Sequence, residues 1–244
     1  RSVYSGCNFT MTVMDASCVD IAYIDADGKA AVCPVATPIA GDCHADVAFS
    51  FGGDVWYVVK EDVTIDGELV FSNVAGSTNI ILCNDATLAV DIISASNKVN
   101  IFVPSNGDHT GAITAITDEE DVIAISVNKD LTINGGKITV SATGNECYGI
   151  YSSEGNITIN GGTIVVNAKK EGIFADERNL TINGGDITVT TNDGYGIDAE
   201  DGDLTINGGK ITTTETNRSG LYANYTTING GTLLVSGTKY GIYG

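Results

Sequence analysis

The sequence has few basic residues and very little proline. Its 244 residues include 12 Lys and Arg against 31 Asp and Glu, which gives a formal net charge of -19. Nucleic acids and anionic membranes are bound through basic patches that neutralise phosphate, so this balance argues against both as partners. It also argues against direct capture of a polyanion, unless bound cations bridge the two surfaces.

The chain also lacks an apolar run long enough to cross a bilayer, and no stretch shows a helical hydrophobic period. What it contains instead is 27 Ile against 9 Leu, 27 Thr and 30 Gly, with only 3 Pro. β-branched residues fit a pleated, half-buried surface and are mediocre helix formers. The composition therefore predicts an all-β protein with many tight turns and no membrane insertion.

One tetrapeptide, Ile-Asn-Gly-Gly, occurs five times in the second half of the chain. It begins at Ile133, Ile159, Ile182, Ile206 and Ile228, so the spacings are 26, 23, 24 and 22 residues. Two further elements recur in phase with it. One is a Gly-Ile or Gly-Leu dipeptide, and the other is a short strand-like segment after each Gly-Gly. Units of this size cannot bury a face alone, whereas stacked units pair as parallel strands around a continuous apolar core. We therefore predict a single-stranded, right-handed parallel β-helix with three short strands per coil, whose repeated Asn side chains hydrogen-bond from coil to coil.

The repeat is weaker upstream, where Val63-Thr64-Ile65-Asp66-Gly67 is similar to Leu-Thr-Ile-Asn-Gly. We place the β-helix at residues 54–244, with roughly eight coils by coil length. Residues 1–53 are predicted to form an N-terminal β cap, because the end of a solenoid needs a cover. Within it, Val19 to Ile24 and Ala30 to Val35 flank a turn sequence and predict a hairpin. The chain stops at the first strand of a new coil, so we expect the native protein to continue beyond Gly244.

Four of the six cysteines lie in the predicted cap, namely Cys7, Cys18, Cys33 and Cys43. With no His at metal-ligand spacing, they indicate two disulfides and an oxidising compartment. Four cysteines allow three pairings, of which we favour Cys7 with Cys18 and Cys33 with Cys43. Four reduced thiols in a small core are the alternative.

Aligning the coils on the Gly-Ile dipeptide brings one outward position into register. This position is aromatic in four of five coils, and its residues are Tyr151, Phe174, Asp198, Tyr222 and Tyr243. Three more tyrosines, Tyr148, Tyr195 and Tyr240, precede the same glycines. Stacked aromatic rings with flanking polar groups suit sugar rings, so we predict a glycan-binding face. The alternative is that these rings only stabilise the sheet through same-face stacking.

Three carboxylates, Glu154, Glu177 and Asp201, occupy equivalent turns of successive coils. The inter-strand spacing should place them about 5 Å apart. Like charges at that distance face solvent, hold a proton or share a cation, and hard oxygen ligands in turns favour calcium. We therefore predict a calcium site here, with a solvated acidic edge as the alternative.

The chain gives little support for catalysis. Asp193, Asp198, Asp201 and Asp203 supply carboxylates within one coil, but nothing singles out the acid–base pair that glycoside hydrolysis needs. We assign no catalytic residue and expect binding without turnover.

The repeated pattern Gly-Ile-x-Ala-x-x-x-x-Leu-Thr-Ile-Asn-Gly-Gly-x-Ile-Thr-Val resembles the secreted parallel β-helix carbohydrate-binding proteins of clostridial and related gut bacteria, which have the pectin-lyase-like fold. It covers about residues 120–244 well and 55–120 loosely. The resemblance implies a secreted protein that binds plant polysaccharides and calcium without turnover. An Asp often precedes the Gly-Ile dipeptide in that family, whereas this chain has Tyr148, Glu171, Tyr195, Ser219 and Tyr240 there. At that stripe, calcium is therefore expected only near Glu171.

The function predicted from the sequence is a secreted or cell-surface, non-catalytic polysaccharide-binding or adhesin-type β-helix. Its partner would be a plant or host glycan, and the protein would be bacterial and extracellular, either a monomer or part of a larger surface protein. One alternative is a polysaccharide lyase or glycoside hydrolase of the pectin-lyase-like fold. The other is a structural spacer of a surface protein that binds no ligand.

Overall fold

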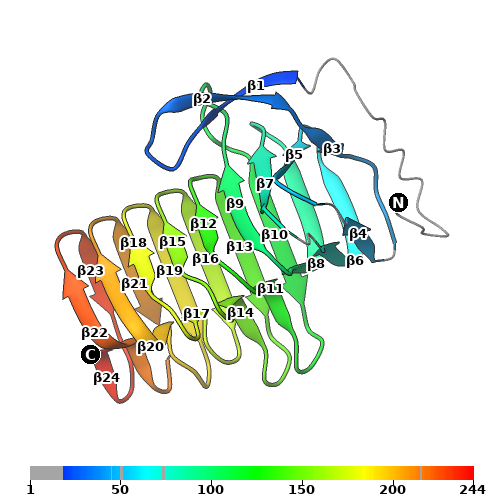
Figure 1. The fold of residues 1–244 in the computed structure, drawn as a ribbon. Coiled ribbons are helices and arrows are strands. Elements are labelled where there is room, and N and C mark those ends of the chain that lie inside the picture. The colour runs from blue at the N-terminus through cyan, green and yellow to red at the C-terminus, as the bar shows by residue number, and fades with distance from the viewer. Residues whose placement is uncertain (1–18, 45, 50–51, 73–74, 215) are drawn as a thin grey trace.

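The computed structural model describes residues 19–44, 46–49, 52–72, 75–214 and 216–244. Every element in these ranges is a β-strand, and none of them contains a helix. Two strands form an antiparallel hairpin, and the other 22 belong to one parallel sheet system that stacks into a β-solenoid of about eight turns (Figure 1). The predicted all-β parallel solenoid is thus confirmed.

The strands follow one another along the chain with short turns between them. The hairpin and the N-terminal part of the solenoid contain β1 (Val19–Ile24), β2 (Ala30–Val35), β3 (Thr37–Ile39), β4 (Val47–Phe49), β5 (Val55–Val59), β6 (Val63–Phe71), β7 (Ser77–Leu82), β8 (Thr87–Ala95) and β9 (Lys98–Phe102). The middle part contains β10 (Ala112–Thr117), β11 (Ile123–Val127), β12 (Leu131–Ile133), β13 (Lys137–Ala142), β14 (Tyr148–Ser152), β15 (Ile157–Ile159), β16 (Thr163–Ala168) and β17 (Ile173–Ala175). The C-terminal part contains β18 (Leu180–Ile182), β19 (Asp186–Thr191), β20 (Ile197–Ile206), β21 (Lys210–Thr214), β22 (Ser219–Ile228), β23 (Thr232–Val235) and β24 (Tyr240–Tyr243).

The hairpin β1–β2 forms as the sequence predicted, with Ile21 opposite Cys33. Tyr23 anchors it to the solenoid, since its ring centroid lies 4.8 Å from those of both Trp56 and Phe102. Parallel pairing already begins at β3, which pairs with β5, upstream of the boundary predicted at residue 54. The role of residues 1–53 as a cap stays a prediction.

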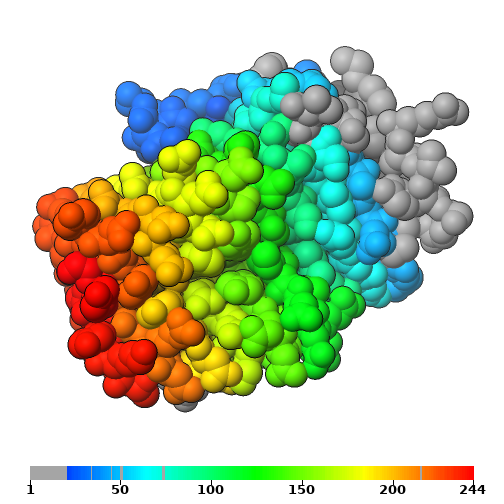
Figure 2. Space-filling view, turned by 60° about the horizontal axis from the view of Figure 1, so that its bottom comes forward, coloured from blue at the N-terminus to red at the C-terminus, as the bar shows by residue number. Residues whose placement is uncertain are grey.

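The interior of the solenoid is a column of aliphatic side chains. The inward isoleucines of the Thr-Ile-Asn segments pair coil on coil, Ile133 with Ile159, Ile159 with Ile182 and Ile182 with Ile206, and all four are buried. Burying one such side chain contributes roughly 1.5–3 kcal/mol. Successive coils lie side by side as adjacent colour bands along the molecule (Figure 2).

The predicted coil-to-coil asparagine bonds are present. The side-chain amides of Asn160, Asn183, Asn207 and Asn229 each donate to the Oδ1 of the Asn one coil before, at 2.7, 2.7, 2.8 and 2.7 Å. The second glycine that follows each Asn turns the chain. Gly185, for example, has a φ of 101°, which L side chains rarely adopt. The Ile-Asn-Gly-Gly motif therefore combines an inward apolar residue, a stacking amide and a left-handed bend.

The predicted Cys33–Cys43 disulfide is wrong. Cys33 has a free, buried thiol that donates to the carbonyl oxygen of Val35 at 3.2 Å. It lies in β2 of the hairpin and packs in a small second core with Val58 and Ile81. Cys43, by contrast, forms an isolated backbone β-bridge with Ile65 of the solenoid. Cys43 is itself disulfide-bonded, and Cys7 and Cys18 lie outside the described residues.

Thiol labelling checks this assignment. Burial raises the pKa of the Cys33 thiol, and Cys147 is also buried with a free thiol, so iodoacetamide should modify neither in the native protein. After unfolding in urea without reductant, both should be alkylated, as seen by peptide mass spectrometry. A peptide containing Cys33 linked to Cys43 would contradict the structure.

Candidate functional site

The strands that carry the Gly-Ile dipeptide form one column on the side of the solenoid. β14 pairs with β17, β17 with β20, β20 with β22, and β22 with β24. Their registers place the five residues of the predicted face directly beside one another, in the order Tyr151, Phe174, Asp198, Tyr222 and Tyr243. The alignment made from the sequence is therefore confirmed, and the glycan-binding role of these residues stays a prediction.

The rings on this column form two groups, one on each side of Asp198. In the first, the Tyr151 and Phe174 centroids are 5.4 Å apart, and Tyr148 stacks on Phe174 at 6.1 Å. In the second, Tyr222 stacks between Tyr195 at 4.3 Å and Tyr243 at 5.1 Å. We call these sets the first and second aromatic groups, and Tyr240, 5.5 Å from Tyr243, extends the second.

The glycines of the dipeptide bring neighbouring coils into close approach. A Cβ at Gly196 would lie 2.5 Å from the carbonyl oxygen of Gly220 in the next coil and 3.0 Å from Cγ2 of Thr213. Real Cβ atoms do not come so near a backbone oxygen, so only glycine fits. The close approach of the coils therefore explains why glycine precedes Ile197 in this strand.

Asp198 lies in the middle of the face and is buried, with 1% of its surface exposed. Its neighbours in the column are Phe174 and Tyr222, and strands in a sheet are only about 4.8 Å apart. Oδ1 of Asp198 has no hydrogen-bond partner. Burial first, and then the negative charges of Glu171, Glu200 and Asp176, raise the pKa of Asp198 to about 8. At neutral pH the carboxyl group is therefore largely protonated.

Three more carboxylates surround Asp198, and we call the four together the acidic centre: Glu171, Asp176, Asp198 and Glu200. Glu171 is also buried, and burial raises its pKa. Oδ2 of Asp176 accepts a hydrogen bond from the hydroxyl of Tyr151 at 2.7 Å, which ties the acidic centre to the first aromatic group. On the other side, the guanidinium of Arg218 lies over the ring of Tyr195, 5.1 Å from its centroid.

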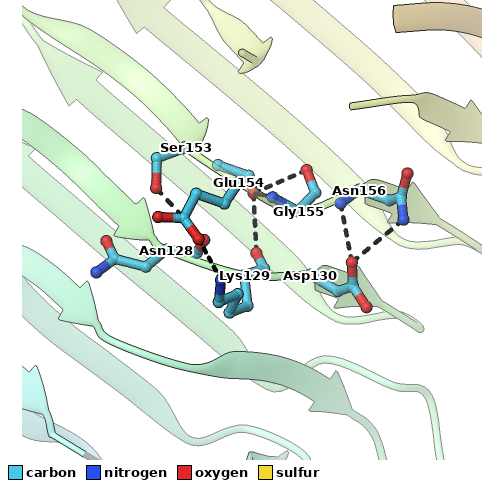
Figure 3. Close-up of polar contacts among 8 residues, drawn as sticks. Asn128, Lys129, Asp130, Ser153, Glu154, Gly155 and Asn156 are labelled. Carbon is cyan, nitrogen blue, oxygen red and sulfur yellow. Dashed lines mark hydrogen bonds and ion pairs between the residues drawn. The ribbon is translucent and has the colours of Figure 1, made fainter. Parts of the chain in front are cut away.

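The turn predicted to bind calcium has a different set of contacts. The carboxylate of Glu154 pairs with the ammonium group of Lys129 in the preceding coil, which lowers the pKa of Glu154 (Figure 3). Glu177 and Asp201 are exposed, and the described His, Cys, Asp and Glu residues form no group of three that could hold a metal ion. With one ligand already neutralised, this donor set is a poor fit for calcium, and calcium binding at the turn stays a prediction.

The sequence analysis assigned no role to Asp176 and Glu200. Each of them follows the outward residue of the column by two positions, Asp176 after Phe174 and Glu200 after Asp198. Because side chains alternate along a strand, they lie on the same side of the sheet as Phe174 and Asp198. That spacing could have connected them to the face. The burial of Asp198 and the approach of Arg218 depend on side-chain packing, which the repeat alone does not define.

A rigid sheet that presents two stacked aromatic groups around polar side chains has the features of a sugar-binding surface. A family model described as "Carbohydrate-binding domain-containing protein" matches residues 53–241, so the chain belongs to this family. Comparison with curated proteins and with solved structures found no match. Across the residues that the structure describes, no helix is long and apolar enough to span a membrane.

Proposed function

We propose that this protein is a secreted or cell-surface, non-catalytic, adhesin-type protein that binds a plant or host polysaccharide along the aromatic column. The observation that carries the proposal is the pair of aromatic groups stacked in register on one sheet. Sugar rings pack their C–H faces on such rings while their hydroxyls bond to polar neighbours. Membership in a carbohydrate-binding family supports the same ligand class.

The spacing of the rings favours a chain-like ligand over a single sugar. The two groups occupy successive coils on both sides of Asp198, so a ligand touching both must cross several strands at about 4.8 Å each. The proposal includes right-handed coils of three strands, with residues 1–53 as the cap and a monomer as the binding unit.

Replacing Tyr222 by alanine should test the proposed face. Tyr222 stacks between Tyr195 and Tyr243, so Tyr222→Ala removes the central ring of the second aromatic group. We expect about a tenfold loss of affinity for the glycan that the wild-type protein selects on an array of plant and host oligosaccharides. Tyr151→Ala should weaken binding similarly, and isothermal titration calorimetry would measure both.

Tyr225 provides the matched control for this experiment. It lies on the same strand, β22, but 74% of its surface is exposed and it pairs with Asp203, away from the column. Tyr225→Ala should change the affinity by less than about twofold. Unchanged affinity in both Tyr151→Ala and Tyr222→Ala would show that the glycan does not bind on this face.

A second candidate function is glycoside hydrolysis, and the observation in its favour is Asp198. A buried carboxyl group that keeps its proton near neutral pH is suited to act as a general acid, with an ionised carboxylate nearby as the base. A reducing-end assay on each glycan that binds separates the functions. New reducing ends would favour hydrolysis, and binding without them supports the proposed function. A protein that neither binds nor cleaves would be a structural spacer.

A further inference from the structure

The acidic centre contains more acidic than basic side chains. It contains Asp198 and three carboxyl groups within electrostatic range of it; Arg218 faces Asp198, and Arg218 and Lys170 both act on Glu171. Two of the four, Glu171 and Asp198, are buried. Like charges packed together out of water repel one another, so this arrangement is costly in the free protein.

Asp198 lacks the partner that a buried carboxyl group normally has. Buried polar groups are hydrogen-bonded in nearly all cases, and one without a partner calls for an explanation. Oδ1 of Asp198 is such an atom, and it lies between Phe174 and Tyr222 on the face where the glycan is proposed to bind. A ligand group that donates a hydrogen bond and carries positive charge would satisfy this oxygen and relieve the repulsion.

We propose that the acidic centre binds the ammonium group of a deacetylated amino sugar, within a glycan whose neighbouring rings stack on the two aromatic groups. This inference rests on the proposed function and specifies its ligand class. An ammonium group has three donors and can bond to several carboxylates at once. The flanking rings add to its binding, since aromatic faces attract cations. Acetylation of the same amine removes both the charge and two of the donors.

The same charges disfavour other ligands. A uronic acid would bring a further carboxylate against the four of the acidic centre, on a protein whose net charge is already -19. A neutral sugar could donate a hydroxyl to Asp198 but would leave the repulsion among the carboxylates in place. For a metal ion, the described residues offer no group of three ligands.

Two hexasaccharides that differ only in acetylation test the inference. At pH 6, we expect the wild-type protein to bind the glucosamine hexamer at least about tenfold more tightly than the N-acetylglucosamine hexamer. Asp198→Asn should reduce this preference to about twofold while the affinity for the acetylated hexamer is retained, because the stacking rings remain. Asp186→Asn makes the same substitution at the exposed Asp186–Lys210 pair, away from the acidic centre, and should keep the preference. Glu171→Gln serves as a second variant if Asp198→Asn does not fold.

Proton release gives an independent measurement. Asp198 is protonated at pH 6 in the free protein, so binding an ammonium group beside it should expel a proton, with Glu171, Asp176, Glu200 and Arg218 as the other charges facing it. Calorimetry in two buffers of different ionisation enthalpy should detect this release in the wild type and not in Asp198→Asn. Equal affinity for the two hexamers, or a preference that survives in Asp198→Asn, would overturn the inference. If other glycans bind and neither hexamer does, the inference fails and the proposed function stands. If no glycan binds at all, the proposed function fails.

Discussion

Asp198→Asn should make the protein more stable than the wild type at pH 8 and above. The pKa of Asp198 is about 8 in the folded protein and 3.8 when unperturbed, because burial and the charges of Glu171, Glu200 and Asp176 disfavour its ionised form. Between these two values, the folded state holds a proton that the unfolded state has lost. The free energy of unfolding of the wild type therefore falls as pH rises from about 4 to about 8, by up to about 1.4 kcal/mol per pH unit from this group.

The asparagine variant lacks this dependence, because its amide does not titrate. The difference in unfolding free energy between variant and wild type should increase by a few kcal/mol across that window and level off above pH 8. Urea unfolding at one-unit steps from pH 4 to 9 measures it. Asp186→Asn is the matched control, since Asp186 is exposed and pairs with Lys210, and its difference from the wild type should stay nearly constant. If the difference for Asp198→Asn is also constant across the window, Asp198 is not the buried, proton-holding group described above.

The fold could be predicted because the repeat determines which residues are neighbours. Once Ile159 and Ile182 are placed in equivalent positions, the two-residue alternation of a strand assigns the residues around them to the inside or the outside. The asparagine bonds and the register of Tyr151 with Phe174 follow from the same alignment. The irregular spacing of the repeats did not disturb this alignment. The register of β20 with β22 shifts between Ala199 and Asp203, and it is regular again from Asp203 onward.

The acidic centre could be predicted only in part, because alternation gives the direction of a side chain and not its enclosure. Asp198 points outward from the strand as expected, but it is buried, flanked in the column by Phe174 and Tyr222. The pairing of Lys129 with Glu154 could not be predicted either, because alternation does not define the conformation of two long, exposed side chains. The predicted cysteine pairing was wrong for another reason. Distance along the chain does not reveal that Cys33 belongs to the hairpin and Cys43 to the solenoid.

Gly196→Ala should destabilise the protein and weaken glycan binding together. The added Cβ would lie 2.5 Å from the carbonyl oxygen of Gly220, an atom of the neighbouring coil's backbone that cannot rotate away. Forcing the two coils apart should cost roughly 1–3 kcal/mol, as overpacking does in a dense interior. The shift would also separate Tyr195 from Tyr222, which stack at 4.3 Å across the same two coils. Urea unfolding and glycan titration measure the two effects.

Gly161→Ala is the control that separates this contact from the general effect of adding a methyl group. Gly161 lies in the Ile-Asn-Gly-Gly turn of an earlier coil, outside the left-handed region of φ, and its Cβ would meet only the carbonyl oxygen of Asn134 at an ordinary 3.7 Å. Its stability should change by less than about 0.5 kcal/mol, with glycan affinity unchanged. If the two variants are equally stable, the close approach of the coils does not require glycine at this position of the Gly-Ile dipeptide.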